Sequence, residues 1–185
     1  MDRGAAKAEK ERIRREVRAA AETLDPAGLR EAGRAITRRV LALPAWQKAR
    51  TVMAYVSMPA EPDTRELMET ALREGKTLLL PRCVDRERMT ALPVKDLSGL
   101  VRGRLGIPEP PEAEENATVP EPDLILVPCM AASPQGIRLG HGAGYYDRFL
   151  SERRGEKVCL CFRVFLRADL PAEDTDVPMD LVVTD

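Results

Sequence analysis

The stretch DLILVPCMAASPQGIRLGHGAGYYDRFL, residues 123–150, decides the fold. Its first part, residues 124–127, is a continuous apolar run of the kind found in buried parallel strands. Its last part opens a helix-like segment over residues 145–152. Three alternating glycines lie between the two: Gly140, Gly142 and Gly144. A glycine-rich turn between a strand and a helix lets backbone N–H groups close on an anion, and the helix N-terminus adds positive charge. The stretch therefore predicts a phosphate site.

Two charged side chains flank this loop. Arg138 supplies a fixed cation beside the glycines, and Asp147 lies just inside the following helix. A carboxylate that close to bound phosphates would repel them unless a cation lay between, so Asp147 is a candidate Mg²⁺ ligand. The alternative is that Asp147 only stabilises the helix start, where an acid is favourable by ~0.3–1 kcal/mol.

Two common nucleotide motifs are absent. The loop does not have the G-x-G-x-x-G spacing, so a dinucleotide site is not indicated. Gly75-Lys76-Thr77 resembles the end of a P-loop, but Thr70 stands where the first glycine of that motif belongs. Gly75 is better explained as the residue that ends a helix before a strand.

Strand-like and helix-like segments alternate outward from this stretch. Helices are expected at residues 5–23, at 26–43 after an Asp25 N-cap, at 64–74 and at 145–152. Strands are expected at 51–57, 77–80, 89–94, 123–127, 157–162 and 181–184, with a connector at 45–49 and a loop at 108–122. This alternation predicts an α/β fold: a single three-layer domain over residues 1–185, with an open, mostly parallel sheet, helices on both faces and an N-terminal helical extension. Ligands in such folds bind at the carboxyl ends of the strands.

Composition narrows the functional classes. The chain has 185 residues, 44% hydrophobic and 32% charged, and its formal net charge is −1. A balanced charge gives no broad attraction to nucleic acid or anionic lipid, so neither partner is expected. No segment approaches the ~18 apolar residues of a membrane span, and the charged N-terminus lacks a secretory apolar core. A cytoplasmic monomer is expected.

Four cysteines are spread through the chain without a metal-binding pattern. They are Cys83, Cys129, Cys159 and Cys161. None forms C-x-x-C and the chain has one histidine, so a zinc site is not indicated. All four are expected to be reduced, mostly buried thiols.

Several motifs in order resemble one known family. Residues 138–147, Arg-Leu-Gly-x-Gly-x-Gly-Tyr-Tyr-Asp, closely resemble the signature of the 5-formyltetrahydrofolate cyclo-ligase family, whose members are also called 5,10-methenyltetrahydrofolate synthetases. The other matching segments are Lys10-x-x-x-Arg14, Glu61-Pro62-Asp63-Thr64, Gly75-Lys76 with Pro81, Gly106-Ile107-Pro108-Glu109-Pro110, residues 123–128 and residues 180–184. The glycine run is highly specific, and the resemblance covers nearly the whole chain.

The resemblance implies an ATP- and Mg²⁺-dependent ring closure of 5-formyltetrahydrofolate. The γ-phosphate of ATP would be transferred to the formyl oxygen, N10 would attack the activated carbon, and loss of phosphate would give 5,10-methenyltetrahydrofolate. Such chemistry needs a phosphate cradle, a metal to offset charge and rigid positioning, but no protein nucleophile. No Ser/His/Asp or Cys/His set stands out in the chain.

The resemblance also implies roles for individual residues. The ATP-binding positions are Lys10, Arg14, Arg138, Leu139, Gly140, His141, Gly142, Ala143, Gly144, Tyr145 and Tyr146. The substrate-binding positions are Val56, Glu61, Leu105 and Tyr146, and the metal positions are Asp147 and Asp176. Taken without the resemblance, the charged residues could equally be solvated surface groups and the apolar ones core packing.

Departures from the family pattern leave two alternatives open. His141 and Ala143 stand where some members carry Arg or Lys, Thr175 where the family often has His, and Leu105 where some members have Trp. The chain could instead be a relative with the same ATP loop and a different substrate. It could also be a non-catalytic nucleotide-binding module, although such a module has no need of a metal carboxylate.

Overall fold

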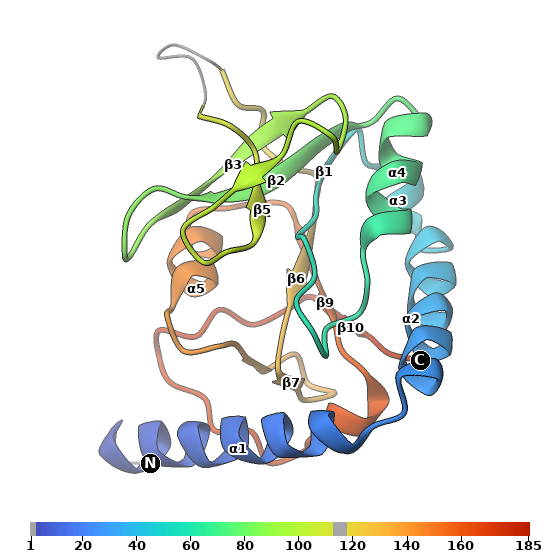
Figure 1. Ribbon diagram of the computed structural model, residues 1–185. Helices are drawn as coiled ribbons and strands as arrows, with labels where there is room; N and C mark the ends of the chain where they lie inside the picture. Colours follow the sequence, from blue (N-terminus) through green and yellow to red (C-terminus); the bar gives the residue numbers. More distant parts are fainter. Residues whose placement is uncertain (1–2, 113–117) are drawn as a thin grey trace.

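A six-stranded sheet runs through the middle of the molecule (Figure 1). In the computed structural model, which describes residues 3–112 and 118–185, the strands lie in the order β10-β9-β6-β1-β2-β3. All neighbouring pairs are parallel except β2 with β3. The strand bounds are β1 Thr51–Met53, β2 Thr77–Cys83, β3 Met89–Val94, β6 Leu124–Pro128, β9 Glu156–Leu160 and β10 Leu181–Val183. The predicted open, mostly parallel sheet is confirmed.

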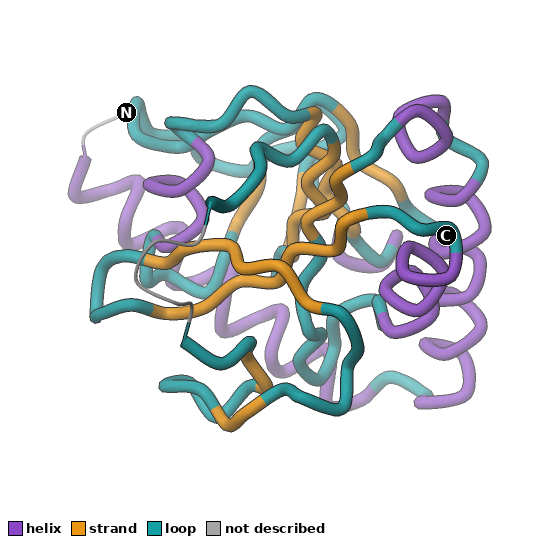
Figure 2. Tube along the Cα trace, turned by 90° about the horizontal axis from the view of Figure 1, so that it is seen from above, coloured by secondary structure: helices purple, strands orange, loops and turns teal. Residues whose placement is uncertain are grey.

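Helices cover both sides of this sheet, as Figure 2 shows. One group of three helices, α2, α3 and α4, lies on one side, and α5 lies on the other (Figure 1). The first helix, α1, crosses below the ends of β1 and β6 as the predicted N-terminal extension (Figure 1). The helix bounds are α1 Arg3–Thr23, α2 Pro26–Leu41, α3 Pro44–Lys48, α4 Arg65–Arg73 and α5 Tyr145–Leu150, with a short 3₁₀ turn η1 at Arg163–Phe165.

The start of α2 follows directly from local sequence. The Asp25 carboxylate accepts hydrogen bonds from the N–H groups of Ala27 and Gly28, at 3.2 and 2.9 Å, and Pro26 occupies the first helical position. These bonds satisfy two donors that the helix itself cannot pair. The predicted N-cap is therefore confirmed, and Gly75, with φ of 73°, ends α4 as expected.

Several predicted boundaries were wrong. Residues 45–49 were expected to be a connector, but α3 forms there around the fully buried Trp46. The first strand stops at Met53 instead of residue 57, while β2 runs on to Cys83 because β3 pairs with its residues 78–83. Two small hairpins were not expected: β4 (Val101–Arg102) with β5 (Pro108–Glu109), and β7 (Ala131–Ala132) with β8 (Arg138–Leu139). A strand of two residues is too short to show the alternating pattern by which strands are predicted from sequence.

The apolar core encloses the central strands. Residues 124–127 of β6 have no exposed surface, as the continuous apolar run predicted. Cys129, Cys159 and Cys161 are buried and Cys83 is half-buried, and all four are free thiols, which confirms the prediction. Within the described ranges, no helix combines the length and apolarity needed to cross a membrane.

Candidate functional site

One large pocket, about 870 Å³, opens where α1 passes the carboxyl ends of β1 and β6. The pocket is walled by the glycine loop, by α1, by the loop after β1 and by the β4–β5 hairpin. Every residue that the sequence singled out for ATP, folate or metal lines it. Segments that are far apart in the chain meet here because parallel strands direct their following loops to the same edge of the sheet.

The glycine loop has the backbone geometry that only glycine adopts readily. Gly142 and Gly144 have φ values of 105° and 72°, and Gly144 is the residue before the first turn of α5. A side chain at Gly142 would also meet the guanidinium of Arg14 at 3.3 Å. Both observations explain why this loop is rich in glycine. The loop therefore brings its backbone close to the α1 cations.

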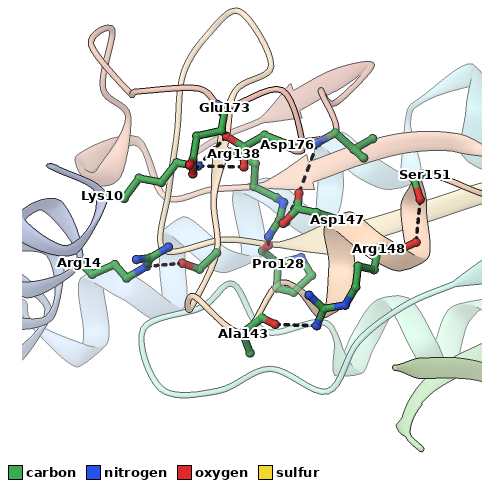
Figure 3. A network of polar contacts seen from close by, with 12 residues as sticks. Lys10, Arg14, Pro128, Arg138, Ala143, Asp147, Arg148, Ser151, Glu173 and Asp176 are labelled. Carbon is green, nitrogen blue, oxygen red and sulfur yellow. Dashed lines mark hydrogen bonds and ion pairs between the residues drawn. The ribbon is translucent and has the colours of Figure 1, made fainter. Parts of the chain in front are cut away.

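Arg14 ties α1 to the glycine loop. Its Nε donates to the carbonyl oxygen of Gly140 at 2.9 Å (Figure 3), and its side chain also contacts Glu11 at 3.2 Å. Only 12% of the side chain is exposed. Arg14 therefore fixes the helix against the loop while lining the pocket.

Lys10, one turn earlier on the same face of α1, is bound to acids from the C-terminal segment. Its Nζ lies 2.6 Å from Glu173 and 2.6 and 2.8 Å from the two oxygens of Asp176 (Figure 3). The predicted spacing does place Lys10 and Arg14 together on one side of the pocket. Glu173 was not predicted, and no motif marks it in the sequence.

Arg138 lies beneath the loop and is paired with Asp147. Its Nη2 contacts both oxygens of Asp147 at 2.9 Å, and Nη1 reaches the carbonyl oxygen of Pro128 at 3.4 Å (Figure 3). Arg138 is 4% exposed and Asp147 is 23% exposed. The guanidinium also faces the Tyr146 ring at 5.6 Å, and its buried Nε has no partner among residues 3–112 and 118–185. The Arg138 charge is therefore already matched by a carboxylate.

Asp147 makes no helix-capping bond. Among the described residues no side chain caps α5, and besides the bonds from Arg138 the Asp147 carboxylate accepts only a long contact, 3.4 Å, from the Val177 N–H. That contact brings Asp147 next to Asp176, so the two candidate metal carboxylates lie at one end of the pocket. Within the described part of the chain, no group of three or more protein ligands forms a ready metal cage. Two carboxylates beside a phosphate cradle are the donor set that suits Mg²⁺, which takes its other ligands from phosphates and water.

The other end of the pocket is mostly apolar, with two buried carboxylates. Glu61 is 5% exposed; one oxygen accepts from the Met58 N–H at 2.7 Å and the other lies 2.9 Å from Nε2 of His141. Glu109, also 5% exposed, accepts from the Cys83 N–H at 3.3 Å. Glu109 belongs to the family-like segment 106–110, but nothing in the sequence indicated that its side chain would face this pocket.

The aromatic and aliphatic wall changes the acidity of its polar groups. Burial, followed by the negative charge of Glu61, raises the pKa of Tyr146 well above its usual value. Burial likewise raises the pKa of the Cys83 thiol to about 11, with Glu109 as the next cause. Val56 is partly buried against the core, whereas Leu105 is 57% exposed at the rim. Burial thus extends the pH range over which both groups stay neutral.

Comparison with known proteins identifies the family. The family model of the 5-formyltetrahydrofolate cyclo-ligases matches residues 6–185. The chain belongs to the 5-formyltetrahydrofolate cyclo-ligase family. The cyclo-ligase of Mycolicibacterium smegmatis is 38% identical over 144 residues, which are 73% of this chain and 73% of that protein. The cyclo-ligase of Escherichia coli is 32% identical over 167 residues, 87% of this chain and 92% of that protein.

A solved structure of this family has the same fold. The structure of Aquifex aeolicus 5,10-methenyltetrahydrofolate synthetase superposes with a TM-score of 0.83 and 32% sequence identity, covering 94% of this chain and 88% of that one. The cyclo-ligase match begins within α1 and ends at the last residue, so it includes the α1 cations, the glycine loop and the acidic C-terminal segment. The fold class and the family resemblance are both confirmed.

Proposed function

We propose that this protein closes 5-formyltetrahydrofolate to 5,10-methenyltetrahydrofolate with consumption of ATP. The observation that carries this proposal is that a glycine-rich loop and an apolar, carboxylate-bearing wall face the same pocket. Membership of the cyclo-ligase family gives the reaction class. A pocket of about 870 Å³ is within the range of small-molecule sites.

The phosphate end of the pocket would bind the triphosphate of ATP. The N–H groups of the glycine loop, which lead into the N-terminus of α5, supply donors without side-chain entropy. Arg14 stands against the loop, and Lys10 lies at the acidic cluster one helical turn away. Both side chains line the pocket, so a triphosphate bound along the loop would lie beside two cations.

Asp147 and Asp176 would hold Mg²⁺ between themselves and the phosphates. The metal would offset the charge that accumulates on the phosphates during transfer. Arg138 pairs with Asp147, and Lys10 pairs with Asp176. Each proposed metal carboxylate is therefore also held in place by a neighbouring cation.

The apolar end would bind the pterin and exclude water. Glu61 would accept hydrogen bonds from the donor edge of the ring, while Val56, Leu105 and Tyr146 would pack against its faces. With the formyl oxygen held toward the phosphate loop, transfer of the γ-phosphate makes that oxygen a good leaving group. N10 then attacks the formyl carbon and gives up its proton, and departure of the former formyl oxygen as phosphate gives the methenyl product. The protein would accelerate the reaction mainly by holding the reacting atoms in the right geometry. No side chain has to act as a nucleophile.

One absorbance measurement tests the reaction. The protein is mixed with 5-formyltetrahydrofolate and Mg-ATP, and the methenyl chromophore is followed; matched samples lack ATP or contain ADP instead. We expect product only with ATP, at one ADP per methenyl group formed. ATP hydrolysis without the chromophore would indicate a relative with another substrate, and absence of both would leave a binding module.

The role of Glu61 is tested by Glu61→Gln. The variant retains the side-chain shape but replaces an acceptor by a donor, and an unpaired buried group costs about 1–3 kcal/mol. We expect the KM for the folate to rise by about 10-fold or more, since 1.4 kcal/mol is a factor of ten, with ATP affinity unchanged. An unaltered KM with a collapsed kcat would assign Glu61 a chemical role instead.

A further inference from the structure

A buried carboxylate that the family resemblance gave no role, Glu109, lines the apolar end of the pocket. Glu109 lies on β5, which pairs with β4, and only 5% of the residue is exposed. Apolar residues share this wall with it: Pro81, Met89, Ile107 and Pro108. A charged group in such surroundings is costly unless hydrogen-bond donors face it. The Glu109 carboxylate therefore needs donors close by.

The described part of the chain gives Glu109 few donors. Oε2 accepts one long bond, 3.3 Å, from the Cys83 N–H of β2, and residues 3–112 and 118–185 form no ion pair with this carboxylate. Arg82, also on β2, donates to the Pro110 carbonyl oxygen instead, at 2.7 Å. The Cys83 thiol, whose pKa the Glu109 charge helps to raise, is only a weak donor. A carboxylate accepts about four hydrogen bonds, so most of this capacity is left for groups inside the pocket.

The β4–β5 hairpin fixes where the Glu109 carboxylate lies. A Cβ atom at Gly103, in the turn of this hairpin, would overlap the Glu109 carboxyl group. Gly103 also donates its N–H to the Ile107 carbonyl oxygen at 2.9 Å, which closes the turn. Because Gly103 has no side chain, the carboxylate can lie directly against the turn while it accepts the bond from Cys83. Glu109 is therefore confined between the hairpin turn and β2.

A buried carboxylate selects a ligand by its N–H groups. It repels phosphates and carboxylates, so neither the ATP triphosphate nor the glutamate end of a folate suits this wall. The tetrahydropterin ring carries N–H donors at its 2-amino group, at N3 and at N8. The proposed function gives the edge formed by the amino group and N3 to Glu61. Since N5 carries the formyl group, the ring N–H that remains is the one at N8.

We propose that Glu109 is a substrate-binding residue that accepts a hydrogen bond from the pterin N8–H. This inference rests on the proposed function. The ring would then be held by two carboxylates, Glu61 from the loop after β1 and Glu109 from the β4–β5 hairpin. A fully oxidised pterin has a lone pair and no hydrogen at N8, and this lone pair would face the Glu109 charge. Glu109 would therefore make the pocket selective for reduced folates.

Two matched ligands test the contact with N8–H without turnover. They are 7,8-dihydrofolate, which has N8–H, and folic acid, which does not, and neither carries a formyl group. Their Kd values are measured by titration calorimetry. We expect the wild type to bind 7,8-dihydrofolate at least about tenfold more tightly than folic acid, because only the reduced ring donates to the carboxylate. Affinities that do not differ would overturn the proposal, and this comparison needs no variant.

The variant Glu109→Gln assigns the selectivity to this side chain. Its amide oxygen can still accept the Cys83 N–H, while its amide nitrogen is a donor. We expect the Kd for 7,8-dihydrofolate to rise about tenfold or more. The Kd for folic acid should stay the same or fall, since the amide can donate to the N8 lone pair. If Glu109 only supported the hairpin, both ligands would be weakened alike, and that result would overturn the proposal.

A control variant and a turnover assay complete the test. Glu112→Gln removes an exposed charge from the same segment outside the pocket, and it should leave both Kd values unchanged. A wild type that forms the methenyl product but binds both ligands equally would refute only the contact between Glu109 and N8–H. A wild type that forms no product from 5-formyltetrahydrofolate and Mg-ATP would refute the proposed function, and this inference with it.

Discussion

Replacing Asp147 by Asn should destabilise the protein even without ligands. The wild-type carboxylate accepts two 2.9 Å bonds from Arg138, whose side chain is 4% exposed. Asp147→Asn preserves the shape and one acceptor oxygen but removes the negative charge. Arg138 would then remain buried with one bond to the amide oxygen, one long bond to the Pro128 carbonyl oxygen and an unpaired Nε, and no negative charge would face it. The destabilisation arises because the buried Arg138 guanidinium loses its negative partner and cannot be solvated by water instead.

The magnitude follows from burial. Breaking a buried ion pair from one side typically costs about 3–5 kcal/mol, and a hydrogen bond to a charged group contributes about 1.5–3 kcal/mol. Because Asp147 is 23% exposed and the amide oxygen can still accept one bond, we expect a loss of about 2–3 kcal/mol in the free energy of unfolding. In a protein of this size that corresponds to a fall in Tm of about 4–12 °C.

Urea unfolding and calorimetry without nucleotide or Mg²⁺ measure this loss. The matched control is Glu69→Gln, which removes the charge of an exposed ion pair with Arg65 and should cost less than about 0.5 kcal/mol. A double-mutant cycle with Arg138→Met should show that the two changes together cost less than their sum, since the second removes the stranded charge. A Tm equal to that of the wild type would refute the structural role of the pair.

The same variant separates structure from metal binding. Turnover of Asp147→Asn should fall sharply at limiting Mg²⁺ and recover in part at higher Mg²⁺, because a proposed ligand has been weakened. The stability of the ligand-free protein should not respond to Mg²⁺ in this way. Near-normal turnover at limiting Mg²⁺ would contradict the metal role and leave only the pairing with Arg138.

Three further outcomes are expected. Arg14→Ala should weaken binding of an ATP analogue measured by calorimetry, whereas Lys76→Ala should not, because the Lys76 amine bonds the Ala49 carbonyl oxygen away from the pocket. A raised pKa of about 11 leaves Cys83 almost without thiolate at neutral pH, so a thiol reagent should react slowly with the native protein. After unfolding in urea the reagent should label all four cysteines readily, and rapid labelling of the native protein would contradict this expectation. Burial raises the pKa of Tyr55 and Tyr146, so the folded state favours their neutral form; the stability this gives is complete below about pH 10 and is lost at higher pH, when the unfolded chain ionises. Tyrosinate absorbance should therefore appear together with unfolding, and ionisation of all tyrosines in a still-folded protein would contradict it.

The sequence by itself determined the local elements and the fold class. The apolar run at residues 124–127 and the Asp25-Pro26 helix start each act over a few residues and formed the predicted strand and helix, and the alternating glycines lead into the predicted helix at Tyr145. Alternation of strands and helices was enough to predict the parallel sheet, since short right-handed connections leave few other arrangements. The ordered motifs also identified the family.

Only the tertiary structure decided how the charges of the pocket pair. The sequence predicted Arg138 and Lys10 beside phosphates and Asp147 and Asp176 beside a metal, but it could not show that these cations and acids pair with one another. Nor could it show that His141 of the glycine loop would meet Glu61, 80 residues earlier in the chain. Such contacts depend on how whole elements pack, because it is the packing of the sheet that brings α1 and the loops after β1 and β6 to one pocket. Local sequence does not determine this arrangement. Long-range packing sets these distances, and a spacing pattern along the chain carries no such information.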